Sequence, residues 1–399
     1  MAGYNAGYQY GFGSMLVAHL FMTLVVITLS CMLMELASAF PFASGCATYA
    51  TAAFGSVAAC VMGYSYTLEL LFQGSQATQF VGVTFETMFS STPNVSPLYW
   101  AVTLTICFCL NLRPKLALEV LAVCCGISIL CYFVCVFMVM THANLPLQLA
   151  IFSNTTTSNL SPSSLFPLGA LGVIKSYPYA LYLLICFEVL PCIAEETKEV
   201  GIHLHRGMSI AVGMLITMSW ISLILTPALP AGVSLVQSAA FPFSEMMSSV
   251  YPMSHPQAIT VLSFPAMFSS QLGIFFACTR FIYGLSRGGF FPTAWSLTTS
   301  RGAPYIAMIM VTVTQFILCV AIKFSGLDSS QAYVSYKKEG CGGFGIYKFA
   351  QPSLFCQHRF SCSLEISVRA FRISLSPSCT WKFDFPCQHY HGLLNRHLD

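Results

Sequence analysis

Long apolar stretches alternate with short polar or turn-forming segments over residues 1–324. A membrane-spanning α-helix needs about 20 mostly apolar residues, and most of these stretches reach that length. The pattern therefore predicts eight spans after a short apolar stub at the start of the chain. In order, the stub and the spans are 1–9 (part of a span), 11–40, 56–89, 97–112, 116–140, 168–193, 207–229, 257–286 and 304–324. Such continuous runs argue against a β-barrel, whose strands are alternating segments of about ten residues.

Composition places the chain in the same class. Of its 399 residues, 56% are hydrophobic and only 8% are charged, whereas soluble domains carry roughly 25% charged residues. The formal net charge of +3 is too small to indicate a nucleic acid partner. The chain opens without the basic segment that begins a secretory signal peptide. We expect an all-α, multi-pass integral membrane protein surrounded by lipid, located in the plasma membrane.

The basic residues between the spans predict which side faces the cytoplasm. Loops on one side carry Arg113, Lys115, Lys198, Arg206, Arg287 and Arg301, whereas the opposite loops carry only Lys175. Basic loops stay in the cytoplasm, so the first group is assigned to that side. The three N-glycosylation triplets begin at Asn94, Asn154 and Asn159 and fall on the opposite side. Asn154 is the best acceptor, because a proline follows each of the other two triplets.

The segment from Tyr179 to Gly207 interrupts its own apolar run. Glu188 lies within the run, and Pro191 follows three residues later. A carboxylate in hydrocarbon is costly, so Glu188 is expected to face protein or a water-filled cavity. Proline clashes with the carbonyl four residues earlier, which predicts a break between Phe187 and Pro191. Broken helices of this kind build substrate sites in secondary transporters. The alternative is a kinked helix in which Glu188 only bonds a neighbouring helix.

Residues 325–399 differ in character from the rest. They hold 13 of the Asp, Glu, Lys and Arg residues and five of the 18 cysteines, without a helical period or a run long enough to span. The cysteine spacings match no zinc signature, and the earlier cysteines lie in apolar runs where they act as small hydrophobic residues. We expect a disordered tail, and no metal or cofactor anywhere in the chain.

Three groups of residues resemble motifs of the amino acid–polyamine–organocation (APC) superfamily of secondary transporters, especially its amino acid and ethanolamine permeases. The groups follow the second span, surround the sixth and follow the eighth. They are Glu35-Leu36-Ala37 with Pro41, Ser44-Gly45 and Ala53-Phe54-Gly55; then Phe187-Glu188, Glu195-Glu196, Lys198 and Arg206-Gly207; then Arg280, Tyr283, Leu285-Ser286-Arg287, Gly289, Phe291-Pro292 and Pro304. Each motif is short, but three in the right order make the resemblance specific over about residues 2–324.

The resemblance implies a LeuT-like helical bundle of two inverted five-helix repeats, with the first and sixth spans broken around the substrate. Measured against that pattern, the chain is expected to be incomplete: it holds part of span 1 through span 9, and no span 10. Two further departures concern single positions. The family's glycine after the sixth-span glutamate is Val189, and its arginine pair before Ala-Phe-Gly is Thr51-Ala52.

The resemblance also implies where functional residues lie. The expected substrate-binding residues are Gly3, Tyr4, Asn5, Glu69, Phe187, Glu188 and Val189. A second set is expected to form a cytoplasmic gate, consisting of Glu195, Glu196, Lys198, Arg206, Arg280 and Arg287. The alternative for the second set is that its members only determine topology and are solvated.

The leading hypothesis for function is secondary active transport of amino acids or related amines by alternating access, coupled to protons or sodium ions as in a symporter. Glu69 and Glu188 would bind the substrate ammonium or carry a coupling proton. Two alternatives stay open: a truncated, transport-inactive protein with the same scaffold, and a receptor-like helical membrane protein. An enzyme is not expected, because the sequence contains no nucleophile elbow, phosphate-binding loop or set of metal ligands.

The charge asymmetry generates a test of topology. We expect Asn154 to be glycosylated in a eukaryotic host and Arg206 and Arg287 to lie in the cytoplasm, because basic loops are retained there. Single cysteine replacements at these positions can be probed in intact cells with an impermeant thiol reagent. Labelling at position 206 or 287 would show that the predicted orientation is wrong.

Overall fold

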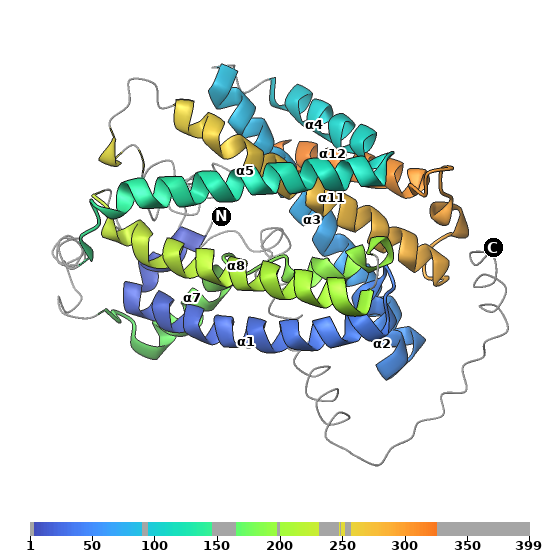
Figure 1. Cartoon of the computed structure of the whole chain (residues 1–399), viewed down its shortest axis with the longest axis horizontal. Coiled ribbons are helices and arrows are strands. Elements are labelled where there is room, and N and C mark those ends of the chain that lie inside the picture. Colours follow the sequence, from blue (N-terminus) through green and yellow to red (C-terminus); the bar gives the residue numbers. More distant parts are fainter. Residues whose placement is uncertain are drawn as a thin grey trace, which may run out of the picture. The chain divides into compact units, whose positions relative to one another are not determined.

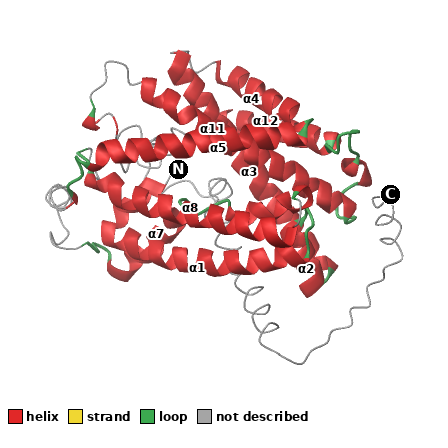
Figure 2. Cartoon of the chain, in the orientation of Figure 1, coloured by secondary structure: helices red, strands yellow, loops and turns green. Residues whose placement is uncertain are grey.

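The structure is a computed structural model that describes residues 4–89, 95–145, 165–197, 200–230, 247, 249–251 and 257–324. Within these residues all the named elements are helices, which confirms the predicted all-α class (Figures 1 and 2). They are η1 (Tyr4–Tyr10), α1 (Phe12–Ala39), α2 (Gly45–Phe54), α3 (Ser56–Phe89), α4 (Ser96–Asn111), α5 (Pro114–Met140), α7 (Gly169–Leu181), η3 (Phe187–Glu196), α8 (Val200–Ala228), α11 (Gln257–Arg287), η4 (Thr293–Ser296) and α12 (Tyr305–Phe324), where η marks a 3-10 helix.

Five of these helices, α1, α5, α8, α11 and α12, are long and apolar enough to cross a membrane. The helix ends lie close to the ends of the predicted spans except in α8 and in the sixth span, which is described below. Helix α8 begins at Val200 rather than at residue 207. The stretch before Gly207 is polar, so hydrophobicity marks the membrane boundary there while the helix continues past it. Gly3, Asn154, Lys198 and residues 325–399 lie outside the described residues.

The sixth span is interrupted, but not where Pro191 predicts. Helix α7 ends at Leu181, and Pro191 lies inside the 3-10 helix η3, so the expected break between Phe187 and Pro191 is wrong in position. The direction of the chain changes at Cys186, whose φ of 75° is left-handed. The proline clash belongs to α-helical geometry, and the tighter winding of η3 accommodates Pro191 without ending the helix.

Two groups of buried side chains divide most of the helices between them. The α1–α8 cluster joins η1, α1, α7 and α8, with Tyr8, Met15 and Leu223 among its fully buried members. The α3–α11 cluster joins α2, α3, α4, α11 and α12, and Tyr66 and Phe281 meet edge-to-face within it, with ring centroids 4.6 Å apart. These are the two largest of four core clusters among the described residues, and the interrupted span contributes to both.

Helix α5 presents most of its apolar surface outward. Only 6% of its most apolar stretch is buried, and Val123, Leu130 and Phe137 are all strongly exposed. A soluble protein rarely exposes so large an apolar surface. The helix is therefore suited to contact with lipid.

Helix α11 lies close to the connector between α1 and α2 at Gly284. A Cβ atom added there would lie 2.6 Å from the backbone nitrogen of Ser44 and 3.0 Å from its Cα. Backbone atoms cannot rotate away as a flexible side chain does. Close helix approach in membranes depends on such small residues.

We predict that Gly284→Ala destabilises the protein because α11 or the connector must move. Overpacking of this kind typically costs about 1–3 kcal/mol, partly offset by the better helix propensity of alanine. The matched control is Gly126→Ala in α5, where an added Cβ meets nothing within 4 Å. Thermal unfolding of the purified protein in detergent measures both, and equal melting temperatures would contradict the steric role of Gly284.

Candidate functional site

The 3-10 helix η3 contacts both hydrophobic clusters with different sides. Phe187 and Leu190 pack against the α1–α8 cluster, whereas Val189 and Cys192 belong to or pack against the α3–α11 cluster. A 3-10 helix repeats every three residues, so each of these pairs shares a side. The same period puts Glu188 on the third side, with Pro191. The carboxylate that the sequence singled out therefore lies between the two sides that carry the apolar packing.

The turn before η3 connects to helix α3 through polar side chains. The Cys186 thiol donates to Oε1 of Gln73 at 4.0 Å, and Nε2 of Gln73 donates to Oε1 of Glu69 at 3.5 Å. Both contacts are at the long end of the hydrogen-bonding range. Glu69 itself is buried, with 7% of its surface exposed. The structure thus brings Glu69, from the third span, close to the interruption of the sixth.

Cys186 stores backbone strain at this point. It is the one non-glycine residue with a positive φ among the described residues. A left-handed conformation in a residue with a Cβ costs of order 1–3 kcal/mol. Such strain concentrates at functional sites, where the surrounding structure holds it in place.

The predicted first-span residues Tyr4 and Asn5 lie in η1 and are buried. The Tyr4 hydroxyl is hydrogen-bonded to Oγ1 of Thr226 at 2.7 Å, and the Tyr8 hydroxyl donates to the carbonyl of Leu223 at 2.8 Å. Both partners belong to α8. Helix η1 is therefore anchored to α8 and packs against α7, within the α1–α8 cluster.

Two ion pairs join the end of η3 to helix α11. Nη2 of Arg280 lies 2.7 Å from Oε1 of Glu196, and Nη1 of Arg287 lies 3.5 Å from Oε2 of Glu195. The two pairs differ in burial, because the Arg280 side chain is 8% exposed and that of Arg287 is 42% exposed. Four members of the predicted cytoplasmic gate are therefore in contact.

Further bonds hold these four residues in place. Glu195 also accepts a hydrogen bond from the backbone N–H of Ala43 at 3.0 Å, and Arg280 donates to the carbonyl of Gly302 at 3.0 Å. Arg206 is exposed on α8 and has no ion pair within the described part of the chain.

His19 is a buried polar residue that the sequence reading overlooked. Its Nε2 lies 3.1 Å from Oγ of Ser219, and its ring meets that of Trp220 edge-to-face at 5.0 Å. The indole N–H of Trp220 in turn donates to Oγ1 of Thr23 at 3.2 Å. A single histidine inside an otherwise apolar span is itself a signal of function or of helix pairing, and it was visible in the sequence.

The described residues contain no group of three or more His, Cys, Asp or Glu side chains arranged to hold a metal ion. The chemistry that the arrangement offers is that of carboxylates, amides and backbone groups around an interrupted helix. Such groups suit the binding of a small zwitterion or amine.

Comparison with known proteins adds one match. The family model described as "Amino acid permease" matches residues 1–335. A search of curated proteins found no match.

The two ion pairs generate a prediction about stability. Glu196→Gln should cost about 1.5–3 kcal/mol, since it leaves the largely buried Arg280 without its counter-charge. Glu195→Gln is the matched control and should cost about 0–1 kcal/mol, because its pair is more exposed and the amide can still accept from Ala43. Thermal unfolding of both variants side by side tests the difference, and a larger loss for Glu195→Gln would contradict it.

Proposed function

The chain belongs to the amino acid permease family, whose members carry amino acids across membranes and are not enzymes, and on that premise we propose how this chain binds and moves its substrate. The substrate is an amino acid or a related amine, and it binds at the interruption between α7 and η3. The observation that carries the proposal is the left-handed turn at Cys186, with η3 between the two clusters and Glu69 close by.

The substrate's two charged groups find complementary partners in this region. The ammonium group is attracted to Glu188 and Glu69, which supply the carboxylates near the interruption. The carboxylate group binds backbone N–H groups at the start of η3, as anions do at helix N-termini. The Phe187 ring covers the apolar part of the ligand. Tyr4, Asn5 and Gly3 of the first span, and Val189, complete the proposed site.

The proposed mechanism of alternating access is a relative motion of the α1–α8 cluster and the α3–α11 cluster. We propose that each cluster moves as a unit, and that a rocking motion of one against the other opens the site to either side of the membrane. The ion pairs of Glu196 with Arg280 and of Glu195 with Arg287 would close the cytoplasmic side. Opening toward the cytoplasm requires both pairs to separate, so substrate and coupling ion must supply the difference in free energy between the two states.

The coupling ion is a proton or a sodium ion. Carboxylates serve either ion, since they can be protonated or can coordinate sodium through oxygen. Glu69 and Glu188 are the proposed carriers.

The proposal predicts that Glu188→Gln lowers uptake at least tenfold, about 1.4 kcal/mol, which is the scale of one charge-assisted hydrogen bond. The amide is nearly isosteric, so folding should be retained. The measurement is uptake of labelled amino acids, and of ethanolamine, by the full chain in proteoliposomes with an imposed proton or sodium gradient. Glu119→Gln, an exposed carboxylate on α5, is the control.

Other outcomes of this experiment would overturn parts of the proposal. Normal uptake by Glu188→Gln at every pH, together with loss of uptake in Glu69→Gln, would assign the functional carboxylate to the third span. Absence of gradient-driven uptake by the unaltered chain would favour the transport-inactive alternative.

A further inference from the structure

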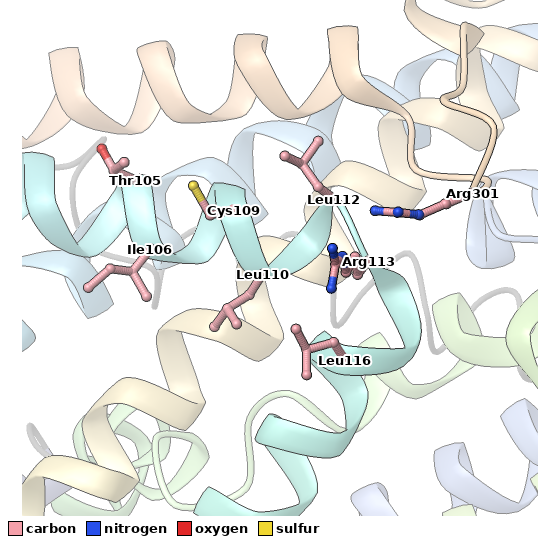
Figure 3. A pocket seen from close by; sticks show the side chains of 8 residues that line it. All are labelled: Thr105, Ile106, Cys109, Leu110, Leu112, Arg113, Leu116 and Arg301. Carbon is pink, nitrogen blue, oxygen red and sulfur yellow. The ribbon is translucent and has the colours of Figure 1, made fainter.

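A groove lies away from the interrupted span, where the end of α4, the start of α5 and the loop before α12 meet (Figure 3). It encloses about 550 Å³. Ile106, Cys109 and Leu116 contribute to an apolar part of its lining, and Arg113 and Arg301 line it as well. It is therefore an apolar groove with two cations.

The two arginines are available to a ligand. Both are exposed, and neither has an ion pair with a carboxylate in the described part of the chain. Glu119 is the nearest acidic residue along α5 and does not line the groove. The loop that carries Arg301 is fixed, because the carbonyl of the next residue, Gly302, accepts a hydrogen bond from Arg280. The charge of the groove is thus positive and uncompensated.

Apolar stripes extend from the groove along both helices. On α4, Leu98, Val102 and Ile106 are exposed at four-residue intervals, which places them on one side of the helix. On α5, Leu116 and Val123 begin an exposed stripe that continues along the helix. Both stripes lead from the arginines toward the middle of the membrane. A soluble anion would use only the arginines, whereas a lipid would use the stripes as well.

We propose that this groove binds an anionic phospholipid of the cytoplasmic leaflet. The phosphate and acidic headgroup lie between Arg113 and Arg301, and the acyl chains follow the exposed stripes of α4 and α5. The positive end of the α5 helix dipole, at Pro114, adds to the attraction. The basic loops already assign this end of the helices to the cytoplasmic side, where anionic lipids are enriched.

The test is to count bound lipids on the purified full chain by native mass spectrometry during titration with phosphatidylserine. One basic residue near a membrane surface contributes about 1 kcal/mol to the attraction of anionic lipid, which is about fivefold in affinity. Arg113→Gln and Arg301→Gln should each weaken the tightest binding by about fivefold, and the double variant by about twenty-five-fold. Lys175→Gln removes an exposed cation outside the groove, on the opposite side of the membrane by the predicted topology, and is the control, with binding unchanged.

A third variant separates the apolar part of the site from its charge. Cys109→Trp fills the groove while both arginines remain, and it should also weaken phosphatidylserine binding. Competition with soluble glycerophosphoserine, which has the headgroup without acyl chains, should fail at the same concentration. Effective competition by glycerophosphoserine would contradict the proposal, because it would show that the groove binds a soluble anion rather than a lipid. The proposal would be overturned if phosphatidylcholine bound equally well, or if the double arginine variant bound phosphatidylserine like the unaltered chain.

Discussion

The constraint on which the structure depends is that hydrocarbon offers no hydrogen bonds. Every backbone group and charge within the membrane must find its partner inside the protein. An interrupted helix is therefore tolerated only where protein or a cavity surrounds it. Here η3 is enclosed by packing on two sides, from the α1–α8 cluster and the α3–α11 cluster. The strained turn at Cys186 persists because the packing of η3 against both clusters holds it in place.

The same constraint explains the position of helix α3. It is the longest of the described helices and carries buried polar side chains along its length. The surface that carries them cannot face lipid, whereas Val57, Val61 and Leu68 lie on an exposed apolar surface of the same helix. Its polar groups bond to the helices around it: Gln79 donates to the carbonyl of Cys319 at 3.4 Å, and the thiol of Cys319 donates to the carbonyl of Ser75 at 3.3 Å. Polar residues thus direct one surface of α3 to the interior, whereas the apolar α5 lies at the periphery.

Apolar runs in the sequence coincide with helices α1, α5, α8, α11 and α12, because a spanning helix must be apolar over most of its length. Sequence motifs predicted the pairing of Glu195 and Glu196 with Arg280 and Arg287 only as part of a proposed gate, through the resemblance. The position of the break could not be read from the sequence. The left-handed residue is a cysteine rather than a glycine, so the local sequence carries no signal for it.

His19 was missed for a different reason. Its signal was a ring nitrogen donor and acceptor within an apolar span, whereas carboxylates alone were considered there, and the structure places its Nε2 3.1 Å from Oγ of Ser219. The geometry around Glu188 could not be predicted from the sequence pattern either. The side of η3 on which Glu188 lies follows from the three-residue period of a 3-10 helix. The sequence instead favoured an α-helix broken at Pro191.

The unequal burial of the two ion pairs bears on how the cytoplasmic side could open. A pair that is too stable would trap one state, since a ligand shifts an equilibrium only by its differential affinity, typically a few kcal/mol. The Arg287–Glu195 pair is exposed and worth little, so it separates readily. Arg280 is different, because it is desolvated and keeps a second partner in the carbonyl of Gly302. In the proposed opening Glu196 would move away with η3, and that carbonyl and the Phe276 ring, 5.1 Å from the guanidinium carbon, would still stabilise the cation. Helix α11 can therefore keep its arginine in place while η3 moves, and this lowers the cost of opening.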